Sequence, residues 1–215
     1  MKKHFIYLTA ILAISMIFAA CKKNDSGDNT NNNTAQFIIE ATNVLDAISD
    51  IATAKAHFTY SDEDFDVLAT AKYENGKFQL TLPNTMESRY LHYAADSHNF
   101  YEEWVSDIEA KTTLIGMLGI YAYDKMGDVI GIFYCAGENS STSCHAYYVY
   151  ADRKFTITGT EGYEIVNCTF NKGWNIVYCC CINDDDELST TTTQKPAGIT
   201  MKWHYEDSSN SKKGK

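Results

Sequence analysis

Six cysteines in the second half of the chain are the residues most able to do chemistry. Three of them are consecutive, and four acidic residues follow almost at once in the run CCCINDDDEL. The six are Cys135, Cys144, Cys168, Cys179, Cys180 and Cys181. Zinc sites use paired CxxC spacings, which these cysteines lack. Neighbouring side chains of a β-strand point to opposite faces, so three consecutive thiols cannot converge on one ion.

A disulfide is the second kind of chemistry open to these thiols. Export from the cytoplasm would place the chain on an oxidising route, and six cysteines allow many pairings. Cys135 ends one predicted strand and Cys144 begins the next, so we expect this pair to form the bond. Cys168 lies in a strand predicted to form a hairpin with residues 174–182, where Cys179 or Cys181 would meet it. Buried thiols that act as small apolar side chains are the alternative.

Histidines and acids provide one further candidate metal site. Imidazole and carboxylate groups are ordinary zinc ligands, and His92, His98, Glu102 and Glu103 lie close together in the sequence. Their spacing matches no metal site, so solvated loop residues are the preferred interpretation. The acids at 184–187 lack the alternating oxygen ligands of a calcium loop. No motif of a catalytic nucleophile or phosphate loop is present, so we predict no metal, cofactor or catalytic residue.

Aromatic side chains offer binding rather than catalysis. The chain has 15 tyrosines, and several lie on neighbouring predicted strands. With one tryptophan, these tyrosines would make a platform on which sugar rings or a protein partner stack. The candidates are Tyr121, Tyr123, Tyr147, Tyr148, Tyr150 and Trp203. The alternative, that they fill a β core, is the preferred interpretation because large apolar side chains are usually buried.

The N-terminal segment indicates where this chemistry would take place. Two lysines precede an apolar run at residues 5–17, which is too short for a comfortable transmembrane helix and is typical of a signal peptide. The run FAAC that ends at Cys21 resembles the lipobox of bacterial lipoproteins. The resemblance implies that residues 1–20 are removed and that Cys21 is acylated. Several acyl chains hold a protein stably on a membrane.

Polar segments border one region that is able to fold. Residues 21–36 contain the lipidated cysteine and a run too poor in apolar residues to fold, so we predict a disordered tether. Residues 207–215 are predicted to be a disordered tail. The body at 37–206 is long enough for one core, which is preferred, or for two small units at 37–95 and 110–206.

The charge of the chain limits its partners. Asp and Glu number 28 against 18 Lys and Arg, which gives a formal net charge of −10. No dense basic patch is present. We therefore expect no nucleic-acid partner, and the membrane is reached through the lipid anchor rather than through charge.

Alternation of apolar and polar residues predicts an all-β body. Even positions are apolar in residues 52–59, and Asn75-Gly76 predicts a tight hairpin turn. One apolar face of the next strand is predicted to contain Phe65, Val67, Ala69, Ala71 and Tyr73. About a dozen strands predict an antiparallel β-sandwich, or two small packed β-units. At most one short helix is expected, at residues 99–108, and residues 114–123 are expected to form a central strand.

Three segments resemble those of a known group of proteins. YENGKFQLTLPNT, NKGWNIVY and TTTTQKPAGITMKWHYED are similar to recurrent segments of uncharacterised surface lipoproteins of Bacteroidetes. The resemblance implies an all-β fold and a lipid-anchored, surface-exposed place on the outer membrane, and it supplies no catalytic residues. We expect a non-catalytic protein that binds a glycan, peptide or protein partner. The alternative is a pilus-like or accessory subunit of a surface complex that acts through β-strand addition.

Overall fold

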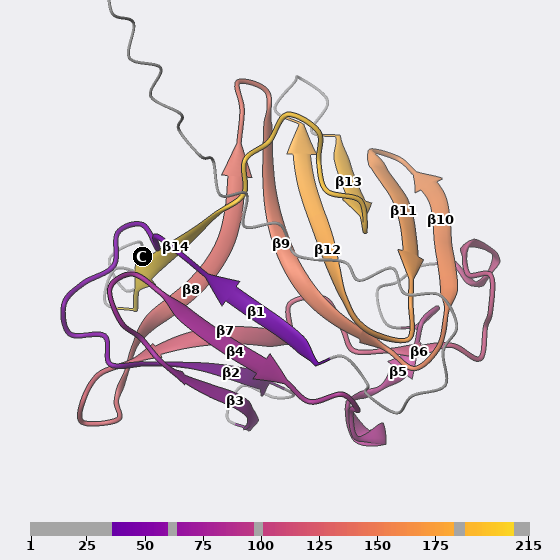
Figure 1. Ribbon diagram of the computed structural model, residues 1–215. Helices are drawn as coiled ribbons and strands as arrows, with labels where there is room; N and C mark the ends of the chain where they lie inside the picture. Colours follow the sequence, from indigo (N-terminus) through magenta and orange to yellow (C-terminus); the bar gives the residue numbers. More distant parts are fainter. Residues whose placement is uncertain (1–35, 60–63, 97–100, 183–187, 209–215) are drawn as a thin grey trace, which may run out of the picture. The chain divides into compact units, whose positions relative to one another are not determined.

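The structure is a computed structural model that describes residues 36–59, 64–96, 101–182 and 188–208. These ranges contain fourteen β-strands, two 3₁₀ helices and no α-helix, which confirms the all-β prediction (Figure 1). The first strands are β1 (Phe37–Ala41), β2 (Thr53–Thr59), β3 (Phe65–Lys72), β4 (Phe78–Leu82), β5 (His92–Tyr93), β6 (Lys111–Thr112) and β7 (Leu118–Tyr123). The later strands are β8 (Val129–Glu138), β9 (Thr142–Ala151), β10 (Phe155–Glu161), β11 (Glu164–Phe170), β12 (Gly173–Ile182), β13 (Ser189–Thr192) and β14 (Lys202–Asp207). The 3₁₀ helices are η1 (Ser88–Tyr90) and η2 (Glu102–Trp104).

Twelve strands form one large sheet, and β1 and β4 form a second sheet. The path of the large sheet runs β10-β11-β13-β12-β9-β8-β7-β2-β3, with β14 beside β8 and β6 beside β9. Every neighbouring pair is antiparallel except β11 and β13, which are parallel. The predicted antiparallel, sandwich-like architecture is therefore confirmed.

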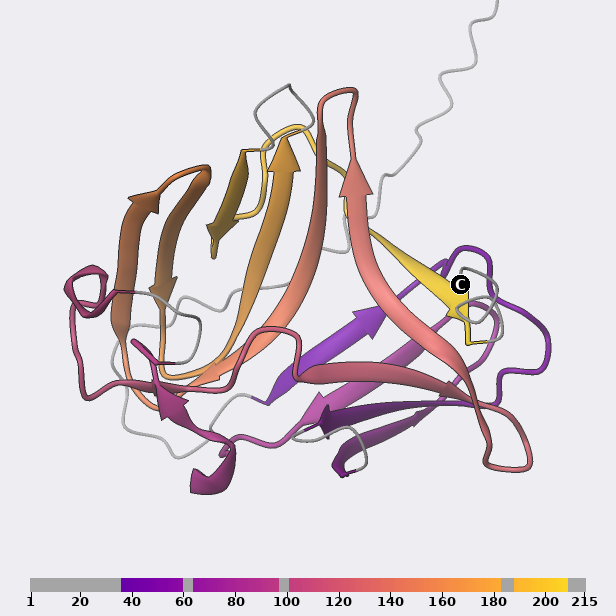
Figure 2. The same ribbon diagram turned by 180° about the vertical axis from the view of Figure 1, so that it is seen from behind.

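The hairpin of β8 and β9 joins the two halves of the large sheet. Near its turn, the two strands pair from Cys135–Ala146 to Glu138–Ser143. Farther from the turn they diverge, because β8 pairs with β7 while β9 continues along β12 (Figure 2). We call β2, β3, β7, β8 and β14 the first half of the sheet, and β9–β13 the second half.

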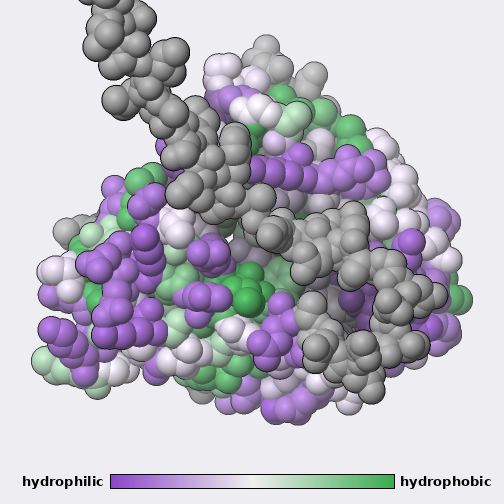
Figure 3. Space-filling view, in the orientation of Figure 1, coloured by the Kyte–Doolittle hydropathy of each residue, from purple (hydrophilic) through white to green (hydrophobic). Residues whose placement is uncertain are grey.

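The first half is covered on one face by β1 and β4. Ile39 and Leu80 of this small sheet pack with Phe58, Ile120 and Phe133 of the large sheet. These side chains alternate with outward-facing ones, as expected for strands with one buried face. Figure 3 views the molecule from the side of β1 and β4, where polar residues surround small apolar areas. The opposite face of the first half points away from this core.

The second half is covered by residues 94–95 and 104–115, on the opposite face of the sheet. Among them, Val105 and Ala110 pack against Val149, Ile157 and Val177. The change of face is visible within β9, where Tyr150 belongs to the first core and its neighbour Val149 to the second. A third, smaller cluster forms around Cys144 and Cys180 on the face turned away from Val149.

Three predicted elements differ from those observed. Strand β7 begins at Leu118 rather than at residue 114, because the chain turns at Gly116 with φ of 84°. The helix predicted at 99–108 is replaced by η2, and its first two residues lie outside the described ranges. The hairpin predicted between β11 and β12 does not pair, since β13 lies between the two strands.

Candidate functional site

A β-bulge in strand β3 determines which side chains reach the outer surface of the first half. Val67 lies opposite His57 and Ala69 lies opposite Ala56, so Leu68 is an extra residue in β3. An extra residue reverses the alternation of side chains along a strand. The single apolar face predicted for residues 65–73 is therefore wrong, because the bulge divides it between the two sides of the sheet.

Two large apolar side chains point outward as a result. Ala69 and Ala71 pack against the first core, whereas Phe65 and Val67 are 49% and 48% exposed. A bulge that re-aims side chains is a device found beside binding sites. The outward side of β3 thus offers apolar surface that folding leaves exposed.

His57 is the centre of a row of aromatic rings on this surface. Its ring stacks on Phe65 of β3, with 4.3 Å between ring centroids and 5° between planes. On the other side lies Tyr121 of β7, at 4.6 Å and 31°. Strands of a sheet lie about 4.8 Å apart, so each of three neighbouring strands contributes one ring. We call the outward side chains Phe65, Val67, Lys55, His57, Tyr121 and Tyr123 the aromatic face.

The contacts of His57 hold this row in place. Its Nε2 forms a 2.8 Å hydrogen bond with the Tyr123 hydroxyl, and the side chain is only 2% exposed. Burial, and then the charge of Lys55, lower the pKa of His57 from 6.5 to about 4. The imidazole is therefore neutral near pH 7. Lys55 places its Nζ 3.8 Å from the centroid of the Tyr123 ring, within cation–π range.

Gly119 makes room for the Tyr121 ring. A Cβ atom at Gly119 would lie 2.6 Å from Cε2 of Tyr121, too close for the ring to stay where it is. Glycine at this position therefore allows the ring to pack closely against the strand. Any side chain at this position would displace one ring of the row.

The same side of the sheet carries more rings beyond β7. Ile132 of β8 lies opposite Tyr121, and Tyr134 follows it on the same side. Tyr134 stacks between His204 and His145, with centroids at 5.2 Å and 5.9 Å. The outward surface therefore continues from β3 across β8.

The six aromatic residues predicted from the sequence do not form one platform. Tyr121 and Tyr123 belong to the aromatic face, where Tyr123 is only 6% exposed, and Tyr150 and Trp203 are buried in the first core at 5% and 8% exposed. Tyr148 packs against the ring of Phe37, at 6.0 Å. Tyr147 lies opposite Val177, on the side of the sheet that carries the second core, near Cys179 and Cys181, and burial raises its pKa. Core packing thus accounts for part of the set.

Sequence reasoning missed the other members of the aromatic face. His57 and Lys55 occupy odd positions of a segment whose even positions are apolar, which is a signal for the outward side. Phe65 carries no such signal, because its odd position continues the apolar series of Ala69 and Ala71. Only the β-bulge at Leu68 places Phe65 on the outward side of the sheet and Ala69 and Ala71 on the core side.

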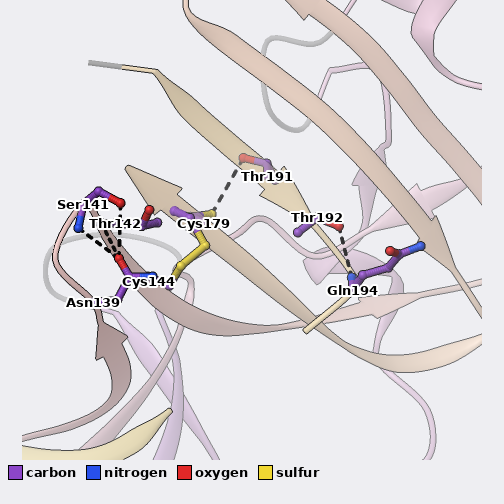
Figure 4. Close-up of a disulfide and its surroundings, with 9 residues drawn as sticks. Asn139, Ser141, Thr142, Cys144, Cys179, Thr191, Thr192 and Gln194 are labelled. Carbon is purple, nitrogen blue, oxygen red and sulfur yellow. Dashed lines mark hydrogen bonds between the residues drawn. A yellow bond between two sulfur atoms is a disulfide. The ribbon is translucent and has the colours of Figure 1, made fainter. Parts of the chain in front are cut away.

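The disulfide joins Cys144 to Cys180, and the predicted partner Cys135 is wrong. Cys144 and Cys180 lie directly opposite each other on β9 and β12, with 4.0 Å between their Cα atoms (Figure 4). Cys135 instead lies opposite Ala146, two residues away from Cys144 in the register of β8 and β9. The register of the hairpin therefore prevents the expected bond. Both cysteines of the bond are buried, Cys144 at 1% and Cys180 at 5% exposed.

Cys168 does not bond to the consecutive cysteines either. Strand β13 separates its strand from β12, and Thr191 of β13 lies beside both thiols. The Cys168 Sγ lies 3.5 Å from the Thr191 carbonyl oxygen, to which it donates. Burial raises the pKa of Cys168 to about 12, and it also raises the pKa of Cys179. Both remain protonated thiols near pH 7, which fits the alternative of cysteine as a small apolar residue.

The described residues contain no metal-binding cluster of three or more His, Cys, Asp or Glu side chains. His98 and the acids at 184–187 lie outside the described ranges. Two shallow hollows of about 390 and 460 Å³ flank the turn at Asn75, and neither is lined by a residue of the aromatic face. Across the described part of the chain, no helix has the length and apolar character needed to cross a membrane. Cys21 lies outside this part as well.

The sheet edges bear on the alternative function of strand addition. Within the described residues, β3 pairs with β2 alone and is an edge strand. Its bulge and the exposed Lys72 are features that discourage pairing with another strand. The other end of the sheet, β10, meets residues 105–106 through a bridge at Ile157. Strand addition stays a prediction.

Comparisons with protein-family models, with curated proteins and with solved structures gave no match. The function therefore has to be argued from the residues of this chain.

Proposed function

We propose that this protein is a non-catalytic lipoprotein of the bacterial outer membrane that binds a glycan at the cell surface through its aromatic face. The observation that carries the proposal is the exposure of Phe65 and Val67 beside the stacked ring of His57. Apolar residues left exposed together, with polar groups around them, are typical of a binding site. The lipobox at Cys21 and the likeness to Bacteroidetes surface lipoproteins support the location.

A glycan suits this face better than a peptide or a folded partner. Sugar rings stack on aromatic rings that are already in position, and His57 is fixed by two rings and a hydrogen bond. His57 itself is only 2% exposed, so sugars would contact the rings on either side of it, Phe65 of β3 and Tyr121 of β7. Lys55 and the tyrosine hydroxyls supply donors for sugar oxygens. Peptides bind in grooves or as an added strand on a regular sheet edge. The β-bulge makes the edge strand β3 irregular, so it is a poor template for an added strand.

We expect Phe65→Ala to weaken glycan binding by about tenfold, which corresponds to about 1.4 kcal/mol of lost stacking. The measurement is the dissociation constant of the full-length chain, purified in detergent, for the best ligand in a panel of neutral and acidic polysaccharides. Tyr163→Ala is the matched control, because Tyr163 is 64% exposed but lies in the turn between β10 and β11. Equal affinity of the Phe65 variant and the wild type, or no binding to any polysaccharide, would count against the proposal.

We expect Cys21→Ala to release the protein from the membrane fraction, because the lipid anchor is its proposed attachment. The measurement is the distribution of the full-length chain between membrane and soluble fractions, together with incorporation of labelled palmitate. Cys181→Ala removes a different cysteine, one that is exposed in the β body, and should leave both readouts unchanged. A Cys21 variant that still sediments with the membrane would contradict the anchor.

A further inference from the structure

We infer that the glycan bound by the aromatic face is anionic, a sugar that carries a carboxylate or sulfate group. This inference rests on the proposed function and names the chemistry of its ligand. The observation behind it is the sign of the charges on the outward side of β2, β3 and β7. In a chain with 28 acidic and 18 basic residues, acids would be expected to outnumber bases there.

The outward positions of these three strands hold two lysines and no carboxylate. Lys55 lies on β2 opposite Tyr121, and Lys72 lies on β3 opposite Thr53, on the same side. Asp66 is the single acid within the three strands, and it lies opposite the buried Phe58, on the core side. There it forms a 2.9 Å ion pair with Arg89. The carboxylate of Asp66 is therefore held away from the aromatic face.

Acids border this surface at the strand ends, where Asp64 directly precedes Phe65 and Asp124 directly follows Tyr123. Glu74 follows the end of β3, where it forms an ion pair with Lys72. Glu206 of β14 lies opposite Ile132 of β8, so strand β8 lies between Glu206 and β7. Neither is placed beside Lys55, whose ammonium group lies over the Tyr123 ring. The positive charge at the centre of the aromatic face thus has no carboxylate next to it among the described strand residues.

This arrangement gives an anionic sugar two kinds of contact at once. The ring of the sugar would stack on Phe65 or Tyr121, and its charged group would reach the ammonium of Lys55. A charge-assisted hydrogen bond of this kind is stronger than one between neutral groups. Because the protein as a whole is acidic, it repels anions elsewhere, and Lys72 is already paired with Glu74, so Lys55 would decide where the ligand docks.

The test compares an oligogalacturonide with its methyl ester, which has the same rings without the charge, and with a sulfated oligosaccharide. Calorimetric titration of the full-length chain in detergent should show about tenfold tighter binding of a charged ligand than of the ester at low salt, and a smaller difference at high salt. Whichever of the two charged ligands, the oligogalacturonide or the sulfated oligosaccharide, binds more tightly identifies the preferred group as carboxylate or sulfate.

Lys55→Met should remove the preference for charge while leaving the affinity for the ester unchanged, and Lys55→Arg should restore it. Lys195→Met, which removes an exposed lysine from the turn before β14, is the matched control. Equal binding of ester and charged ligands would overturn the inference and leave the proposed function standing. Phe65→Ala should weaken all arms together. If a neutral glycan binds and no charged ligand does, the anionic ligand is ruled out and the proposed glycan binding stands. If no glycan binds at all, both the anionic ligand and the proposed function are ruled out.

Discussion

Loss of the Cys144–Cys180 disulfide is expected to lower the free energy of unfolding by about 4 kcal/mol. The two cysteines are 36 residues apart in sequence, and a crosslink that closes a loop of this length removes much of the entropy of the unfolded chain. Both sulfur atoms are buried beside Ile199, so solvent gains little access to the bond in the folded state. For a domain of this size, the melting temperature should fall by about 10 °C.

The measurement is thermal unfolding of the Cys144→Ala/Cys180→Ala double variant against the wild type, with and without a reducing agent. Cys181→Ala is the matched control, because it removes a neighbouring exposed cysteine outside the bond. The reducing agent should destabilise the wild type and the control, and it should leave the double variant unchanged. A double variant that melts with the wild type would show that the bond contributes nothing to stability.

Acidification is expected to destabilise the fold through His57. The pKa of this side chain is about 4 in the folded protein and 6.5 when unfolded, so between these values only the unfolded chain takes up the proton. Its contribution to stability is present above pH 6.5 and is lost as the pH falls through 4. The free energy of unfolding should fall by on the order of 2–3 kcal/mol from this group alone.

His57→Phe separates this effect from the titration of carboxylates. The variant keeps a ring between Phe65 and Tyr121 but cannot be protonated. Urea unfolding at pH 7.5 and at pH 4.5 should show a larger loss of stability for the wild type than for the variant. The same dependence on pH in both proteins would mean that His57 does not cause it.

The strands were predictable from the sequence because alternation and turn residues are local signals. The turn at Asn75-Gly76 is an example, since both residues have positive φ, of 51° and 74°, as the sequence pair predicts. The inward positions of β2 follow directly from its even apolar residues. Local patterns of this kind need no knowledge of distant segments.

The aromatic face and the disulfide depended on relations between strands, which a local pattern does not contain. Nothing in residues 65–73 reveals that Leu68 is an extra residue relative to β2. The partner of Cys144 depends on β12 lying beside β9, 36 residues farther along the chain at Cys180. The insertion of β13 between β11 and β12 reverses the expectation that strands joined by a short turn are paired.

Strand β9 makes folding of the two main cores a single event. Val149 and Ala151 belong to the core of the second half, while Tyr150 between them belongs to the core of the first. Strand β9 thus contributes side chains to both cores. If β9 detaches from one core, it also exposes the other core to solvent. Loosening at one end of the large sheet would be transmitted to the other end, so the chain is expected to unfold as one cooperative unit rather than half by half.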